Sequence, residues 1–377
     1  MSQARARTPA ILALILFLLP APTALAAPET ALVWDLVTVG PDTDLFSLWG
    51  HSALCVSSGE FEQGSCFDFG VPREDDPVRR SLGTLAGARL FGVVKLPTRV
   101  ELAVHQFRDT VRQRLDIPPE RGRALLADLE ALVLTHASYA YQPLFRNCTT
   151  ELRDRLDQAL AGRLRAGADQ PDGVPLRTLA EAGLTGRVVP LSLLALAGGT
   201  VLDQPSTSWQ RMALPDGLMQ AATQRLSAPP VRLFSRTDVP PPTSPAAGRI
   251  VLVLVSALVC FCGWLLVRRR PARARLVGLG LGVGLTLASL PPWAGTLSTL
   301  PCLHDNWMLF ALVPTDGVLC LTPGHWLKRY AWLRLLSLGV LGAAALLGLV
   351  VQSLWIGLWL AGLPLGLWLW IQRRPAR

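Results

Sequence analysis

The chain has 377 residues, of which half are hydrophobic and 17% charged, and its formal net charge is +9. This balance is too apolar for a wholly soluble protein and indicates membrane segments. The cations are mostly arginines in short clusters beside apolar runs, so they indicate membrane topology and argue against a nucleic-acid-binding face.

The first 26 residues have the pattern of a secretory signal peptide. Arg5 and Arg7 give a basic start, an apolar run follows, and Ala24-Leu25-Ala26 fits the small-residue rule for cleavage. We therefore expect residues 1–26 to be removed and the following segment to be exported to an oxidising compartment, where disulfides are allowed.

The exported segment, residues 27–235, mixes strand-like and helix-like runs, which favours an α+β fold. Strands are predicted at 31–40, 51–56, 66–70 and 88–97, and helices at 99–111, at 119–137 and after Asn147. A Pro-rich linker then follows at 236–249, and it is too stiff to continue a core.

Residues 250–377 form a membrane region with about five spans. The apolar runs lie at 250–267, 276–293, 306–321, 335–352 and 354–371. The third is interrupted by Pro314 and Asp316, which also allows a re-entrant segment. Five crossings place every basic cluster on the cytoplasmic side, as the positive-inside rule requires, whereas four would leave one outside.

Cys148 is the candidate nucleophile of the exported segment. Asn147 is a good N-cap for the helix that begins there, and a thiol at a helix N-terminus is stabilised as thiolate. The free N–H groups of the first turn can supply part of an oxyanion hole, and a neutral His51 within reach would act as general base. The competing interpretation is that Cys148 is half of a disulfide or a small buried hydrophobe.

Cys55 and Cys66 flank a polar turn between two strand-like runs, so a hairpin would place them opposite each other as a disulfide. The same register pairs residue 53 with Asp68 and makes Asp68 a diagonal neighbour of His51 on one face of the sheet. Asp68 could then orient the imidazole as the third member of a triad. The alternative for Asp68 is a solvent-facing strand residue.

The remaining polar candidates carry less chemistry. His105 and His136 lie on helix-like runs and are expected to be partly exposed. No CxxC or HExxH spacing occurs, so no metal or other cofactor is expected. Asn147 and, in the outer loop after the second span, His304 and Asn306 are candidate contacts for a substrate or lipid headgroup; the alternative for the loop is a set of interfacial polar residues.

The order His before Cys resembles the circularly permuted, papain-like (NlpC-type) group that contains lecithin retinol acyltransferase. More closely, LVTVGPDTDLFSLWGHSALCV, CFDFG and YAYQPLFRNCTTELRDRL resemble the exported domain of the Lnb family of bacterial lipoprotein N-acyltransferases. The resemblance covers about residues 31–162. It implies His51 as base and Cys148 as nucleophile, an acyl group taken from a phospholipid as a thioester, and a diacylated lipoprotein as acceptor, at the periplasmic face of the inner membrane.

Two other functions remain open at this level. One is a membrane-anchored NlpC-type cysteine peptidase or amidase acting on the cell wall. The other is a non-enzymatic envelope assembly protein in which Cys148 is structural. Tethering alone needs one span, so the predicted membrane bundle favours a lipid substrate over a cell-wall substrate.

Overall fold

The computed structural model describes residues 31–42, 44–236, 244–321 and 324–373. Within it, the chain from Leu32 to Arg377 forms one compact unit. The predicted signal peptide lies outside the described residues, as do residues 237–243, which are half of the predicted Pro-rich linker.

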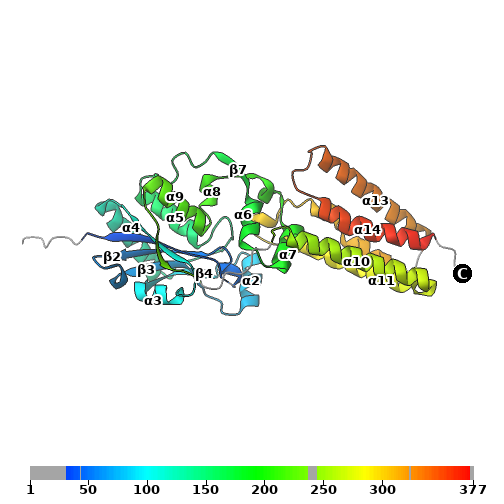
Figure 1. Cartoon of the computed structure of the whole chain (residues 1–377), viewed down its shortest axis with the longest axis horizontal. Coiled ribbons are helices and arrows are strands. Elements are labelled where there is room, and N and C mark those ends of the chain that lie inside the picture. Colours follow the sequence, from blue (N-terminus) through cyan, green and yellow to red (C-terminus); the bar gives the residue numbers. More distant parts are fainter. Residues whose placement is uncertain (1–30, 43, 237–243, 322–323, 374–377) are drawn as a thin grey trace, which may run out of the picture. The chain divides into compact units, whose positions relative to one another are not determined.

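A seven-stranded sheet organises the exported segment (Figure 1). Every neighbouring pair of its strands is antiparallel, in the order β6-β4-β3-β2-β1-β5-β9. The strands are β1 (Val33–Val39), β2 (His51–Ser57), β3 (Ser65–Pro72), β4 (Phe91–Pro97), β5 (Thr110–Leu115), β6 (Ser138–Tyr139) and β9 (Val231–Phe234). Two further strands, β7 (Pro171–Pro175) and β8 (Pro205–Thr207), pair with each other.

Helices cover both faces of the sheet, which is why β1 and β2 are buried along nearly their whole length. The larger core lies under α4 (Pro119–Leu134), α5 (Cys148–Ala159) and α9 (Pro215–Leu226). A smaller cluster on the other face contains Val37, Ala53 and Leu102. Leu102 belongs to α3 (Thr98–Val104), so this helix is the one that meets the hairpin of β2 and β3.

The predicted helix at 99–111 is wrong in its second half. α3 ends at Val104, and residues 110–115 form β5, which pairs with β1 on one side and β9 on the other. The arginines at 112 and 114 are charged residues, which are unusual in a central strand, so the sequence did not predict a strand here. In the structure they reach the buried Asp35 of β1, at 3.7 Å and 3.0 Å.

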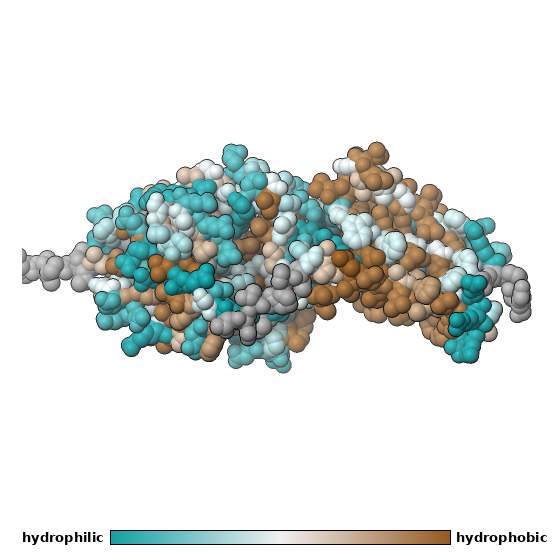
Figure 2. Space-filling model, viewed as in Figure 1, coloured by the Kyte–Doolittle hydropathy of each residue, from teal (hydrophilic) through white to brown (hydrophobic). Residues whose placement is uncertain are grey.

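Four long helices form the membrane region, where the hydrophobic colour gathers in Figure 2. They are α10 (Ala247–Arg269), α11 (Ala274–Gly295), α13 (His325–Leu346) and α14 (Trp355–Gln372). Three stretches of the described residues are long and apolar enough to cross a membrane: α10, the 271–295 stretch that contains α11, and α14. The predicted span at 335–352 is displaced, because α13 begins ten residues earlier and ends at Leu346.

The predicted third span, 306–321, is not a continuous helix. It consists of α12 (Met308–Ala311) and a 3-10 segment, η6 (Pro314–Cys320), because Pro314 cannot continue the helix before it. The segment packs along α11, where Gly282 leaves room for Cys320: a Cβ at Gly282 would lie 2.6 Å from Cys320 Sγ.

Smaller helices complete the exported segment. They are α2 (Pro77–Leu85), α6 (Leu176–Gly183), α7 (Val188–Ala197) and α8 (Ser208–Arg211). The apolar α7 packs against α10, α11 and α14, although it precedes the predicted linker in sequence. The exported segment therefore contributes a helix to the membrane region.

Candidate active site

Cys148 is the first residue of α5, as predicted, and its side chain is buried. The helix start is fixed by a capping box: Asn147 Oδ1 accepts from the Thr150 N–H at 2.9 Å, and Thr150 Oγ1 accepts from the Asn147 N–H at 2.8 Å. The N–H groups of Cys148 and Thr149 precede the first intrahelical acceptor. They are therefore the donors that this helix end offers to a negatively charged oxygen.

His51 is the first residue of β2, and two glycines shape its surroundings. Gly50 has φ +94°, which favours glycine, and it makes the turn that starts the strand. Gly70 of β3 faces the imidazole: a Cβ there would lie 2.7 Å from His51 Cε1. Any side chain at position 70 would have to displace the ring.

The predicted hairpin register is confirmed. Cys55 pairs with Cys66 and forms a disulfide, and Ala53 pairs with Asp68. Asp68 Oδ1 lies 3.1 Å from His51 Nε2 and accepts the Gly70 N–H at 2.5 Å. Asp68 is therefore a partner of the imidazole and not a solvent-facing strand residue.

The thiol of Cys148 and the imidazole of His51 lie close enough for each to shift the pKa of the other. Burial alone lowers the pKa of His51, but the charges of Asp68 and Cys148 outweigh it and raise that pKa well above its ordinary value. Burial alone raises the pKa of Cys148, but His51 and the Ser52 N–H outweigh it and lower that pKa. The shifts favour a thiolate–imidazolium pair between the two pKa values.

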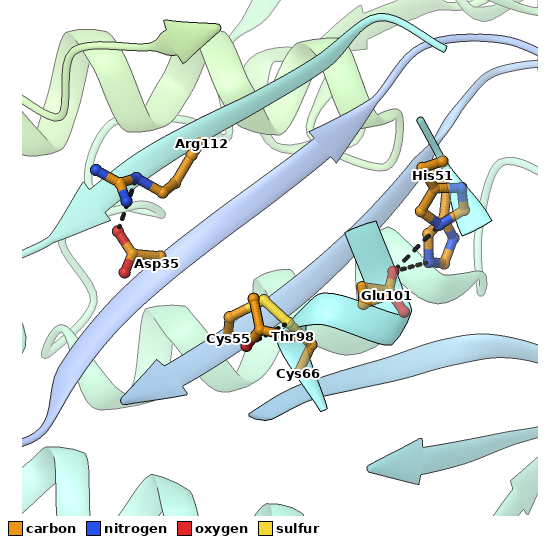
Figure 3. Close-up of a disulfide and its surroundings, with 8 residues drawn as sticks. Asp35, His51, Cys55, Cys66, Thr98, Glu101 and Arg112 are labelled. Atoms are coloured by element: carbon orange, nitrogen blue, oxygen red, sulfur yellow. Dashed lines mark hydrogen bonds and ion pairs between the residues drawn. A yellow bond between two sulfur atoms is a disulfide. The ribbon is translucent and has the colours of Figure 1, made fainter. Parts of the chain in front are cut away.

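A second carboxylate, which the sequence did not reveal, stands beside His51. Glu101 of α3 is buried, and its Oε1 lies 4.0 Å from His51 Nε2 and 3.2 Å from His105 Nε2 (Figure 3). The prediction that His105 is partly exposed is wrong, since only 7% of it is exposed. Spacing Glu and His four residues apart is common on any helix, so no sequence signal identified this face as buried.

The disulfide lies next to the same helix (Figure 3). Thr98, the first residue of α3, places its hydroxyl 3.5 Å from Cys66 Sγ. Because a disulfide sulfur carries no hydrogen, the hydroxyl of Thr98 donates in this contact. The covalent link between β2 and β3 thus also positions the helix that carries Glu101.

The ligand atoms of His51, Glu101 and His105 lie within 4.8 Å of one another, close enough to hold a metal ion. However, Arg108 Nη1 lies 3.4 Å from His105 Nδ1, and arginine can only donate. Nδ1 is then the acceptor, so Nε2 carries the proton that points to Glu101. The arrangement is that of a hydrogen-bonded chain rather than of a ligand set.

Aromatic side chains adjoin the thiol, and a cavity lies next to the residue that precedes the Gly50 turn. Tyr141 is buried, and burial together with the nearby Cys148 thiolate raises its pKa. Its ring packs against Phe91 and Phe46, with centroids 4.6 Å and 5.4 Å away. Trp49, two residues before His51, lines a cavity of about 470 Å³ together with, among others, Leu179, Arg211, Met212 and Leu214.

The three predicted substrate contacts have different surroundings. The Asn147 amide donates to Pro143 O and Ala213 O, so its polar atoms all serve the cap and the adjoining loop. Asn306 is buried and donates to Leu196 O. His304 Nε2 is 2.6 Å from Ser298 O, and His304 and Asn306 line a second cavity of about 660 Å³ near the end of α11.

Among the described cysteines outside the disulfide, all five are free. Cys302 of the outer loop is not bridged to Cys148, and burial raises its pKa to about 11. The surroundings of Cys148 therefore lower its pKa, whereas those of Cys302 raise it.

The sheet and this group of side chains define a mixed α and β domain with a thiol, an imidazole and two carboxylates at one site, followed by membrane-capable helices. Residues 25–182 match the family model of the Lnb N-terminal periplasmic domain. This domain contains Cys148, His51 and Asp68, so the predicted resemblance to the exported domain of the Lnb family is confirmed over these residues. No curated protein and no solved structure matches the chain.

Proposed function

We propose that the protein is a lipoprotein N-acyltransferase of the inner membrane, with a permuted papain-like periplasmic domain that carries the acyl group on Cys148. The observation that carries this proposal is the buried thiol at the start of α5, whose pKa is lowered by an imidazole that two carboxylates flank. The match of residues 25–182 to the Lnb N-terminal periplasmic domain and the apolar helices support a lipid substrate.

In the first half-reaction the Cys148 thiolate attacks the ester carbonyl of a phospholipid. The oxyanion that forms is stabilised by the N–H groups at the start of α5. When the C–O bond breaks, the imidazolium of His51 gives its proton to the leaving oxygen, and lysophospholipid departs. The product is a thioester on Cys148 and a neutral His51.

In the second half-reaction the free α-amine of a diacylated lipoprotein attacks the thioester. His51 takes the proton of the amine, the C–S bond breaks, and the N-acylated lipoprotein leaves. Cys148 is again a thiolate beside an imidazolium, so the cycle balances with no cofactor.

Five membrane crossings are part of this proposal. The Trp293 indole donates to Leu312 O at 2.9 Å, and Cys320 Sγ lies 3.4 Å from Leu279 O. Residues 312–320 thus follow α11 from one end toward the other, as a crossing without regular helix would. Irregular backbone at membrane depth is tolerated where protein surrounds it.

The test is to feed cells an alkyne fatty acid and look for a label on the purified full-length protein that hydroxylamine removes. We expect the label on the unaltered chain and on Cys302→Ala, and none on Cys148→Ala. Mass spectrometry of lipoprotein N-termini in a deletion strain should then show the loss of N-acylation. A thioester absent from the unaltered chain, or retained in Cys148→Ala, would refute the proposal.

A further inference from the structure

The short helix α2 presents its apolar side chains to the outside. Val78, Leu82 and Leu85 are 65%, 61% and 39% exposed, and their spacing places them on one face. Thr84 on another face is buried. A surface helix of a soluble domain does the reverse and turns its apolar face to the core.

Polar contacts hold α2 in this orientation. Arg80 Nη2 lies 3.5 Å from Asp44 Oδ1, and its guanidinium lies over the Phe46 ring at 5.3 Å. Asp76 caps the helix by accepting from the N–H groups of residues 78 and 79. Because the arginine face is fixed against the domain, the apolar face cannot rotate inward.

The end of α2 is joined to the end of a membrane-capable helix. Leu85 O accepts from the Thr299 N–H at 2.8 Å and from Ser298 Oγ at 2.9 Å, and both residues come just after α11 ends at Gly295. Leu297, which directly precedes Ser298, is 87% exposed. Residues so close to the end of a span lie near the membrane surface, so α2 lies at that level too.

We propose that α2 is an interfacial helix that inserts Val78, Leu82 and Leu85 among the acyl chains of the outer leaflet. An amphipathic helix at the level of the headgroups binds in this way. The occupant is the lipid surface itself, because the exposed face continues from the end of α11.

The role of this insertion rests on the proposed function. Phe46, on which Arg80 lies, packs against Tyr141, and Tyr141 adjoins Cys148. The chain of contacts connects the inserted helix to the thiol. The helix would thus hold the entrance of the site at the depth of the phospholipid ester.

The first experiment uses the photoreactive residue benzoyl-phenylalanine at position 82 of the full-length protein in cells. Irradiation should give adducts with phospholipid at position 82. The matched control is position 100, because Val100 is also exposed (46%) but lies on α3, at the end of β4 that is farther from α2 in sequence. Position 100 should give no lipid adducts. Adducts with protein only, or equal lipid adducts at both positions, would overturn the proposal.

The same crosslink in a Cys148→Ala background separates this proposal from acyl transfer. Lipid adducts at position 82 that persist there support insertion even if no thioester ever forms. For the role in catalysis, Leu82→Glu should slow thioester formation at least about tenfold, since charge is disfavoured among acyl chains, while Val100→Glu leaves it unchanged. An equal rate in both variants would overturn that role.

Discussion

The chain contains two buried charged clusters, one around Asp316 in the membrane region and one around His51 in the exported domain, and they differ in how completely their polar atoms are hydrogen-bonded. In the membrane region Asp316 is fully buried and accepts from Arg334 Nε at 2.8 Å, Arg334 Nη2 at 3.0 Å and the Tyr330 hydroxyl at 2.7 Å. The other N–H groups of Arg334 reach Ser337 and the carbonyls of residues 310 and 311.

In the exported domain the charges around His51 are not closed off in this way. Two carboxylates and a thiol share one imidazole, and His51 Nε2 has no aligned hydrogen-bond partner within the described chain. A saturated cluster fixes a structure, because every change breaks a hydrogen bond. An unsaturated, coupled cluster can move a proton. Both clusters are buried and charged. What distinguishes the structural cluster from the candidate catalytic one is that its polar atoms all have hydrogen-bond partners.

The largest effect is expected in the saturated cluster. Arg334→Leu leaves Asp316 buried without its cation, and breaking such a pair costs about 3–5 kcal/mol. Thermal unfolding of the purified full-length protein should therefore show strong destabilisation. Arg329→Leu, on the same helix but exposed, is the control and should change little. If the double variant Asp316→Leu/Arg334→Leu were as unstable as Arg334→Leu, the ion pair would not be the cause.

The next effect concerns the room left for the imidazole. In Gly70→Ala the new Cβ would push against His51 Cε1, and a displacement near 1 Å costs about 100-fold in rate. The rate of thioester formation should fall by that order while the fold is kept. Gly59→Ala is the matched control, because no atom lies within 4 Å of its Cβ position. Equal rates in the two variants would contradict the close approach of Gly70 to the ring.

Asp68→Asn should lower the rate about 10-fold, the effect of losing a charge-assisted contact. It should also shift the pH profile. Asp68 raises the pKa of His51, so its removal lets the imidazolium lose its proton at lower pH, and the alkaline limb of acyl transfer moves down. A profile with an unmoved alkaline limb would show that Asp68 does not act through His51.

The smallest effect is expected at the second carboxylate. Glu101→Gln keeps an acceptor for His105 but removes a charge 4.0 Å from the imidazole, so the rate should fall about fivefold with a small downward shift of the alkaline limb. Glu62→Gln, an exposed change in the hairpin turn, should have no effect. If Glu101→Gln instead lowered the stability and left the pH profile unchanged, Glu101 would stabilise the fold and would not act on His51.

The features decided by near neighbours in the chain were predictable from the sequence. The disulfide joins residues 11 apart, and alternation along the hairpin then placed Asp68 beside His51. The cap at Asn147 and the spacing of the leucines of α5 are likewise set by residues within four positions of each other. In such segments the local pattern and the final packing specify the same conformation.

Only the tertiary structure determined the rest, because the partners come from distant segments. Glu101 reaches His51 because a helix 50 residues later in the sequence packs on the hairpin, and β5 is a strand because Asp35 accepts its arginines. The segment 306–321 places Asp316 against Arg334 of α13, a partner 18 residues later in the sequence. Burial makes each of these polar contacts necessary, and no local pattern encodes which side chain will supply it.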